Sequence, residues 1–270
     1  MNTILSCHDG VFGHEGNPQL ETINFELVCG DYLCIVGENG SGKTTLLETI
    51  LGILPLLGGK LDFGDGLNAS QISYVPQQNH IMHNFPAKVL ELVQTGSAGL
   101  PRRDFSKTDL NRACHAALAA VGLISAAHLS FSALSGGEQQ RILMARALVC
   151  AFLKPQTKDP SATQAQMATR LLILDEPMNG LDPKFKQSLY DLIDRLCDKQ
   201  GLTIIMVTHD VNSAVRHASK ILLLDEQGQR FFGSAHQFQH TRIGNEIIRD
   251  SCGSHCAVCG MELDAGAGEE

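Results

Sequence analysis

This sequence lacks long apolar runs and a recognisable leader. No stretch approaches the roughly 18 consecutive apolar residues of a membrane-spanning helix. The opening residues, MNTILSCHDG, lack the basic region followed by an apolar run that is typical of a secretory signal. We therefore expect neither a span nor secretion, so any link to a membrane would depend on a partner.

An excess of positive charge is also missing. The 21 Lys and Arg residues are outnumbered by 29 Asp and Glu residues, which gives a net charge of −8. This balance disfavours a protein that binds nucleic acid by general electrostatic attraction, so we expect no nucleic-acid partner. Apolar residues make up 43% of the 270 residues, which is ordinary for a globular chain with a large core.

A disulfide framework is not expected either. Nine cysteines are present, six scattered over residues 7–197 and three in the last 20 residues. An odd number without a secretory signal favours a reducing, cytosolic setting.

Short apolar runs alternate with helical patterns along most of the chain. We expect buried strands at residues 32–37, 72–76, 171–176, 203–209 and 220–226. Such an alternation predicts an α/β fold with a parallel sheet covered on both faces. Residues 87–150 interrupt it and read as an inserted helical subdomain within a domain spanning residues 1–240. The polar stretch 154–170 is expected to be a surface loop, and residues 241–270 form a tail.

The stretch GENGSGKTT, residues 37–45, carries the clearest chemical motif. Gly37, Gly42, Lys43 and Thr44 match G-x-x-x-x-G-K-[ST] at every fixed position. Such a loop curls its backbone N–H groups around phosphate oxygens, and the following helix, expected over 43–54, points its positive end at the anion.

Two adjacent carboxylates end another apolar run, LLILDEP. The run carries Asp175 and Glu176 to the edge of the sheet where ligands bind in open α/β folds. The natural division of work is one carboxylate for Mg²⁺ and one for an attacking water. The alternative is a strand end with solvent-exposed acids, which the glycine loop upstream disfavours.

A third motif, LSGGEQQRILMARALV, opens a further helix at residue 135. Ser135 and Glu138 fit a capping box, and two glycines in the first turn allow close approach to the backbone. One nucleotide does not need two phosphate cradles in one chain. A symmetric dimer explains both, if each cradle closes on the nucleotide held by the other copy.

Together, GENGSGKTT, YVPQ, LSGGEQQR, LLILDEP, NGLD and VTHD, in this order, resemble the ATP-binding cassette (ABC) ATPases over about residues 4–235. The resemblance implies a P-loop NTPase parallel-sheet core, an antiparallel β edge near the N-terminus and an inserted helical subdomain. It also implies ATP and Mg²⁺ as ligands and ATP hydrolysis as the activity.

The resemblance implies how the nucleotide is held. Lys43 is expected on the β- and γ-phosphates and Thr44 on the Mg²⁺. The remaining cradle residues are Gly37, Glu38, Asn39, Gly40, Ser41, Gly42 and Thr45.

The same resemblance implies catalytic roles for four residues. Asp175 is expected to hold Mg²⁺ through water, and Glu176 to act as the general base. Gln77 resembles the glutamine that senses Mg²⁺ and the attacking water and links the site to a transmembrane partner. His209 resembles the switch histidine on the γ-phosphate.

Other implied roles concern the dimer interface and the base. Ser135 and Gly137 are expected to face the γ-phosphate of the other copy, and Asp182 to cross the interface between copies. The aromatic residue that usually stacks on adenine is replaced here by His14, with Phe12 two residues earlier, and the sequence leaves open which of them meets the base.

The chain has a single set of these motifs and no membrane span. In this respect it resembles a separate ATP-binding subunit that works as a homodimer beneath permease subunits. Residues 85–96 occupy the region that meets the permease in this family, and the sequence of this region resembles that of the zinc and manganese uptake branch. This implies a peripheral location on the cytoplasmic face of the plasma membrane, with an extracytoplasmic substrate-binding protein in the same system. The alternative is a soluble ABC ATPase of iron–sulfur cluster assembly. A DNA-repair or translation ATPase is disfavoured, because long coiled coils and tandem cassettes are missing.

The tail contains a separate cluster of soft ligands. Cys252, His255, Cys256 and Cys259 lie within eight residues and could bind Zn²⁺, which favours thiolate and imidazole. The alternatives are a tail with free thiols and an iron–sulfur ligand spacing.

Overall fold

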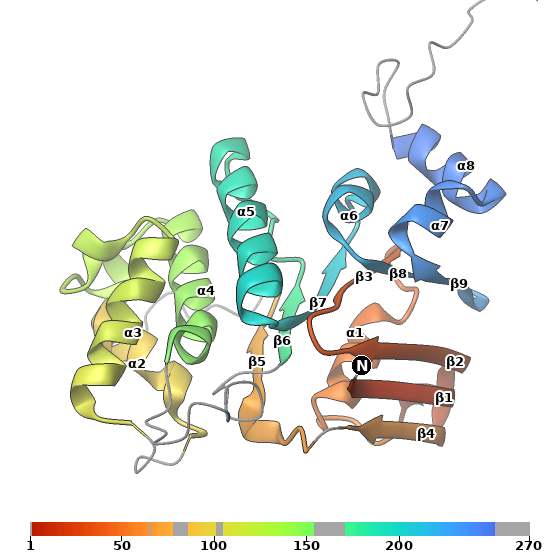
Figure 1. The fold of residues 1–270 in the computed structure, drawn as a ribbon, viewed down its shortest axis with the longest axis horizontal. Coiled ribbons are helices and arrows are strands. Elements are labelled where there is room, and N and C mark those ends of the chain that lie inside the picture. Colours follow the sequence, from red (N-terminus) through yellow and green to blue (C-terminus); the bar gives the residue numbers. More distant parts are fainter. Residues whose placement is uncertain (1, 65, 78–85, 101–104, 154–170, 252–270) are drawn as a thin grey trace, which may run out of the picture.

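The computed structural model describes residues 2–64, 66–77, 86–100, 105–153 and 171–251. Two sheets form its framework (Figure 1). The smaller sheet is antiparallel, in the order β2-β1-β4, and comprises β1 (Thr3–His14), β2 (Asn17–Val28) and β4 (Gly58–Phe63). It is the antiparallel edge that the sequence predicts near the N-terminus.

The larger sheet has six strands in the order β5-β6-β7-β3-β8-β9. They are β3 (Tyr32–Gly37), β5 (Ile72–Val75), β6 (Leu171–Asp175), β7 (Thr203–Thr208), β8 (Lys220–Asp225) and β9 (Gly228–Ser234). All neighbours pair in parallel except β8 and β9, which form an antiparallel hairpin. Every residue of β6 and β7 is buried, because the sheet is covered on both faces. The five predicted strands and the α/β class are confirmed.

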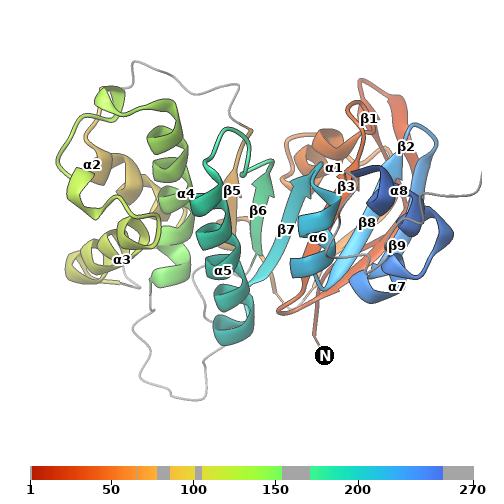
Figure 2. The same cartoon turned by 90° about the horizontal axis from the view of Figure 1, so that it is seen from above.

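Helices surround this sheet, with α1 on one side and α5 and α6 on the other (Figure 2). The helices of the described part of the chain are α1 (Lys43–Ile50), α2 (Val89–Gln94), α3 (Lys107–Ala120), α4 (Gly136–Phe152), α5 (Pro183–Gln200), α6 (Val211–His217), α7 (Ala235–Gln239) and α8 (Arg242–Ser251). Short 3₁₀ turns span Ala69–Gln71, Thr95–Ser97, Ile124–Ala126 and Phe131–Ala133. Figure 2 shows α2, α3 and α4 gathered beyond β5, away from the hairpin β8–β9. These helices form the inserted subdomain expected at residues 87–150.

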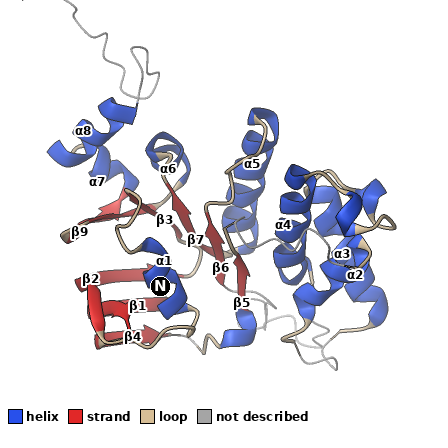
Figure 3. Ribbon diagram, turned by 180° about the vertical axis from the view of Figure 1, so that it is seen from behind, coloured by secondary structure: helices blue, strands red, loops and turns tan. Residues whose placement is uncertain are grey.

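Two apolar cores lie on the two sides of the parallel sheet. One contains side chains of α1 and the antiparallel sheet, and the other contains side chains of α3, α4, α5 and α6. Figure 3 shows α1 beside the antiparallel sheet, at the end of β3. The loop between β3 and α1 is therefore anchored from both sides, which fixes the position of the predicted phosphate cradle.

Two local predictions differ from the structure. The helix expected over 43–54 ends at Ile50, because Gly52 takes a left-handed conformation with φ 73°. Residues 242–251 form α8, which packs on α6 and α7 and which the sequence analysis did not anticipate. The loop expected at 154–170 lies outside the described residues. Within the described ranges, no helix combines the length and apolar character needed to cross a bilayer.

Candidate functional site

The glycine loop leaves the first turn of α1 open. Gly42 precedes α1 as its N-cap, with φ 83°, and no side chain caps this end. Gly40 also has a left-handed φ of 87°, and a Cβ atom added to it would contact no other part of the chain within 4 Å. The N–H groups of a helix start that lacks a side-chain cap are available to an anion, and the helix dipole favours negative charge there.

Lys43 supplies a positive charge at the centre of this loop. Its ammonium donates to the carbonyl oxygen of Gly37 at 2.9 Å and to that of Glu38 at 2.5 Å. Burial lowers the pKa of Lys43, while the nearby carboxylates of Glu176 and Asp175 oppose this shift. A buried ammonium held on neutral carbonyls is a favourable partner for phosphate oxygens.

Asp175 ends β6 as a buried carboxyl group that is 3% exposed. Burial raises its pKa to about 6, and the neighbouring charge of Glu176 adds to this, whereas Lys43 opposes it. The side chain of Tyr74 on β5 hydrogen-bonds to the carboxyl group. A buried carboxylate whose charge is under-compensated fits a divalent cation, and oxygen ligands suit Mg²⁺.

Glu176, the residue after Asp175, has an unusual backbone conformation. Its φ of 47° lies in the left-handed region, and its N–H donates to the carbonyl of Val207 at 3.0 Å. Gln77 donates its Nε2 to Glu176 Oε2 at 2.9 Å, and Asn179 donates its Nδ2 to the same oxygen. Strained backbone held by its surroundings is common at functional sites.

Lys43, Gln77 and Glu176 line one cavity of about 250 Å³, whereas Asp175 is not among its lining residues. Its walls come from β1, β2, β7, the glycine loop, the start of α1 and the residues that follow β5 and β6. The lining residues are His14, Gln19, Asn39, Gly40, Gly42, Lys43, Thr44, Thr45, Gln77, Glu176 and Val207. Hydroxyl, ammonium, amide and carboxylate groups therefore meet around a space at an exposed helix start, as phosphoryl-transfer chemistry requires.

The two candidates for stacking on the adenine base lie in different environments. Phe12 is completely buried in the core beneath the antiparallel sheet, so its ring is not available to a ligand. His14 is exposed, lines the cavity and places its Nε2 3.2 Å from Thr45 Oγ1. Thr45 in turn donates to Gln19 Oε1 at 2.7 Å.

The three residues expected at the interface between copies do not line this cavity. Ser135 is the N-cap of α4; its N–H and its hydroxyl donate to Glu138 Oε2 at 2.9 and 2.6 Å. These bonds lower the pKa of Glu138. Gly137, with open space beside it, follows in the first turn of α4, and Asp182 caps α5 by accepting from the N–H of Phe185 at 2.9 Å. Within one chain, these groups bond to their own helices.

His209 lies next to the first cavity, on a second one of about 320 Å³ that shares Glu176 with it. The other lining residues are Met178, Asn179, Lys186, Thr208, Asp210, Asn212 and Ser251. The expected switch histidine and Lys43 therefore line different cavities, and Glu176 lines both. It follows β7, as the motif VTHD predicts.

Sequence reasoning missed two partners of the carboxylates. Tyr74 stands in YVPQ, three residues before Gln77, and Asn179 opens NGLD, three residues after Glu176. Both residues belong to the motifs YVPQ and NGLD, so the sequence motifs could have identified them as site residues. Gln140 was also missed; it donates to the carbonyl of Pro177 at 3.1 Å and so ties α4 to the turn after β6.

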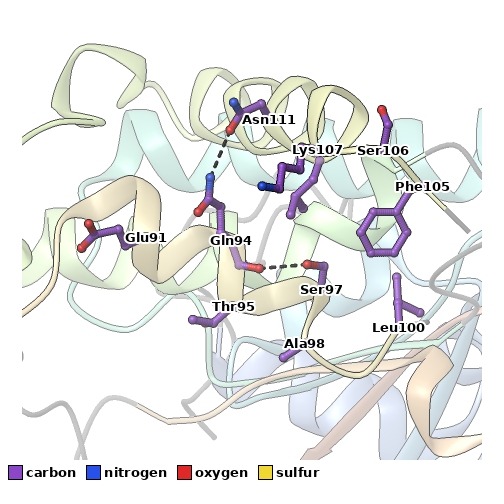
Figure 4. A pocket seen from close by; sticks show the side chains of 11 residues that line it. Glu91, Gln94, Thr95, Ser97, Ala98, Leu100, Phe105, Ser106, Lys107 and Asn111 are labelled. Atoms are coloured by element: carbon purple, nitrogen blue, oxygen red, sulfur yellow. Dashed lines mark hydrogen bonds between the residues drawn. The ribbon is translucent and has the colours of Figure 1, made fainter. Parts of the chain in front are cut away.

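A third cavity, of about 590 Å³, lies in the helical subdomain between α3 and the segment formed by α2 and the 3₁₀ turn Thr95–Ser97 (Figure 4). Gln94 donates to Asn111 Oδ1 at 3.0 Å across it, and Ser97 donates to the carbonyl of Gln94 at 2.9 Å. Its walls mix apolar side chains such as Leu100 and Phe105 with charged and amide groups.

The tail ligands Cys252, His255, Cys256 and Cys259 fall outside the described residues, so the zinc site there stays a prediction. Among the residues that the structure does describe, no group of three His, Cys, Asp or Glu side chains is placed to hold a metal ion.

Comparison with known proteins places this site in a family. The ABC transporter profile matches residues 20–152, and an AAA domain profile matches residues 125–215. The zinc uptake system ATP-binding protein ZurA of Listeria innocua is 31% identical, with 92% of each chain covered. The manganese transport system ATP-binding protein MntB of Bacillus subtilis is 34% identical over 77% of each chain. A solved inward-facing ABC transporter has 29% identity and a TM-score of 0.71, covering 92% of this chain and 90% of its own. The chain belongs to the family of ABC transporter ATP-binding proteins.

Proposed function

We propose that this protein binds and hydrolyses ATP to power an ABC transporter. The observation that carries the proposal is the 250 Å³ cavity, in which the open start of α1, Lys43, Gln77 and Glu176 meet. Phosphoryl transfer needs positioning and charge stabilisation, and these groups supply both.

The chain's own residues divide the work. Lys43 leaves the carbonyls of Gly37 and Glu38 to bind phosphate oxygens, together with the N–H groups that open α1. Glu176 accepts the proton of the attacking water, and Gln77, already bonded to Glu176, orients that water. Thr44 and Asp175 would hold Mg²⁺, which offsets the phosphate charge.

Hydrolysis requires two copies of the chain in this proposal. Ser135, Gly137 and Asp182 do not line the cavity around Lys43. Each would complete the site of a second copy, with Ser135 facing the γ-phosphate held there. His209, on the neighbouring cavity, would contact the same phosphate within its own chain.

The transporter partner would dock on the helical subdomain. The cavity in Figure 4 lies beside residues 86–96, which follow Gln77 along the chain. A permease helix seated there would be linked along the chain to Gln77, the residue bonded to Glu176.

We propose zinc or manganese as cargo, because the relatives named above serve such systems. This places the protein at the cytoplasmic face of the membrane, beside permease subunits and a substrate-binding protein. The comparisons do not favour the iron–sulfur alternative.

The nucleotide test compares two lysines. Lys43→Ala should abolish binding of a fluorescent ATP analogue and phosphate release with Mg-ATP, measured with the permease subunits present. Lys199→Ala removes an exposed lysine in the last turn of α5 and should change neither. Equal binding and turnover in both variants would contradict the nucleotide assignment.

The transport assignment is tested separately. The tagged protein should co-purify with membrane permease subunits, and Lys43→Ala should stop uptake of radioactive zinc or manganese into cells. Recovery of a soluble iron–sulfur scaffold in place of the permease would favour the alternative.

A further inference from the structure

Two exposed histidines lie at α7, well after the nucleotide cavity residues in the sequence. His236 is the second residue of α7, and His240 is its C-cap residue, four positions later and directly after Gln239. Their ring centroids are 4.6 Å apart, with an angle of 62° between the ring planes. Residues at i and i+4 of a helix lie on the same face, which is how two histidines of a helix can bind one metal ion.

The spacing of the two rings matches shared coordination. A Zn–N bond of about 2.1 Å places the metal about 3.2 Å from the centre of each ring, so ligand angles of about 90–110° separate the ring centres by about 4.5–5.2 Å. The observed 4.6 Å lies in this range. The distance between the ring centres therefore allows one metal ion to bind both rings.

The ring nitrogens are free to coordinate. In the part of the chain that the structure describes, neither imidazole makes a side-chain hydrogen bond or an ion pair. Other histidines are engaged: His115 Nδ1 lies 2.8 Å from the carbonyl of Asn111, and His217 Nδ1 lies 2.9 Å from Asp194 Oδ2. Among the described residues, His236 and His240 thus have no such competing partner.

The backbone beneath the pair is held firmly. Ser234 and Gln237 form a capping box at the start of α7, with bonds of 2.9 and 3.1 Å. Phe238, between the two histidines in sequence, is fully buried and packs on Phe231 with ring centroids 5.2 Å apart. An anchored turn keeps two ligands in register, which lowers the entropy lost on binding.

Local charge does not oppose a cation. Arg242 follows shortly after His240, but its Nε lies 2.8 Å from Glu246 Oε1, so its charge is offset. No third His, Cys, Asp or Glu completes a cluster among the described residues, so the remaining coordination positions would hold water. Such a site is open and exchangeable.

We propose that His236 and His240 form a binding site for one borderline divalent transition-metal ion, such as Zn²⁺, Ni²⁺ or Cu²⁺. Imidazole suits these ions, whereas Mg²⁺ and Mn²⁺ prefer oxygen ligands. The site lies on α7, which packs on α6, α8 and β9, and it is separate from the Mg²⁺ ligands proposed above. It does not depend on the proposed function.

The test is a Zn²⁺ titration by calorimetry without nucleotide. The full-length parent carries serine at 252, 256 and 259 and glutamine at 255, because the tail ligands would compete. We expect one Zn²⁺ per chain and no Mn²⁺ binding. Either His236→Gln or His240→Gln should raise the Kd by about tenfold or more. The metal-free melting temperature should not change, because both side chains are exposed.

Matched controls make the result decisive. His128→Gln removes another exposed histidine and should leave the Zn²⁺ affinity unchanged. With Cu²⁺, electron paramagnetic resonance should count two coordinated imidazole nitrogens in the parent and one in each single variant. A Kd within twofold of the parent in both single variants, or an equal loss in His128→Gln, would overturn the proposal.

Discussion

The starts of α1 and α4 both contain glycine and a hydroxyl residue, yet they are in opposite states. At α1 the N-cap is Gly42, no side chain caps the helix, and the buried ammonium of Lys43 lies beside it. At α4 the N-cap is Ser135, which exchanges hydrogen bonds with Glu138 and is exposed. The first helix start is ready for an anion, whereas the second satisfies itself until another molecule replaces its bonds.

The two helix starts also differ in position, because the glycine loop lines the cavity around Lys43 whereas Ser135 and Gly137 do not. The glycine loop sits on β3 in the middle of the parallel sheet, between two apolar cores. The start of α4 lies in the helical subdomain. In the proposed dimer, this self-capped helix start would exchange its bonds to Glu138 for bonds to the phosphate held by the other copy.

The largest expected effect comes from the carboxylate that faces the α1 cradle. Glu176→Gln should lower the turnover of ATP by about 10²- to 10⁴-fold, because it removes the general base. ATP should still bind, and the dimer should become trapped. Phosphate release and size-exclusion chromatography with ATP measure both.

The exposed acid Glu226, in the turn between β8 and β9, provides the control. Glu226→Gln should hydrolyse ATP like the parent. Wild-type turnover in Glu176→Gln would show that the base was misassigned.

The next largest effect is expected at the open helix start itself. In Gly42→Ala the new Cβ would lie 2.7 Å from Leu20 Cγ, in addition to the cost of about 1–2 kcal/mol for a left-handed alanine. Urea unfolding should therefore show a loss above 2 kcal/mol, and ATP affinity should fall. Gly40→Ala shares the left-handed conformation but meets no atom within 4 Å, so it should lose only the backbone cost. Equal losses would refute the role of the contact with Leu20.

A pH effect is expected at Asp175, whose carboxyl group interacts with the charge of Lys43 at the start of α1. Asp175 has a folded pKa of about 6 against 3.8 for the free group, so its ionisation destabilises the folded state as the pH rises from about 4 to 6. Without nucleotide, Asp175→Asn should melt above the parent at pH 7.5 and should lose most of that advantage at pH 4. Mg-ATP should stabilise the parent more than the variant at pH 7.5. Scanning calorimetry at both pH values checks this, and a parent that melts higher at pH 7.5 without ligand would contradict it.

The smallest effect is expected at the self-capped start of α4. Ser135→Ala should destabilise the chain by about 1 kcal/mol through the lost cap, with ATP affinity of the single chain unchanged. Ser106→Ala removes the same kind of capping box from α3 and should cost about as much. Only Ser135→Ala should also lower hydrolysis, which depends on two copies.

Gly137→Ala sharpens this result. No atom lies within 4 Å of the added methyl group, and alanine favours a helix, so the single chain should gain about 0.5–1 kcal/mol. A variant that is more stable yet slower in hydrolysis would locate the defect between the copies. Unchanged hydrolysis in both variants would contradict a role for this helix start in the partner's site.

Local patterns predicted the fold because they carry its physics. The apolar runs marked every parallel strand that the sequence analysis expected, and Ser135 with Glu138 marked the start of α4. The predicted end of α1 was wrong, because the apolar face of the sequence continues past Ile50 whereas Gly52 ends the helix. Periodicity alone does not report where a backbone turns.

Long-range contacts at the site were harder to predict. The bond between Gln77 and Glu176 joins residues 99 positions apart, and the left-handed φ of Glu176 is not encoded by a glycine. The sequence motif also did not reveal that Phe12 is buried in the core. These features depend on three-dimensional packing, and stacking of His14 on the base stays a prediction.

Without a ligand, the Lys43 ammonium rests on two main-chain oxygens of its own loop. In the proposed nucleotide complex, this one side chain would exchange its main-chain partners for phosphate oxygens. The positive charge is thus already in the loop before a ligand arrives and would not have to be brought in from another part of the chain.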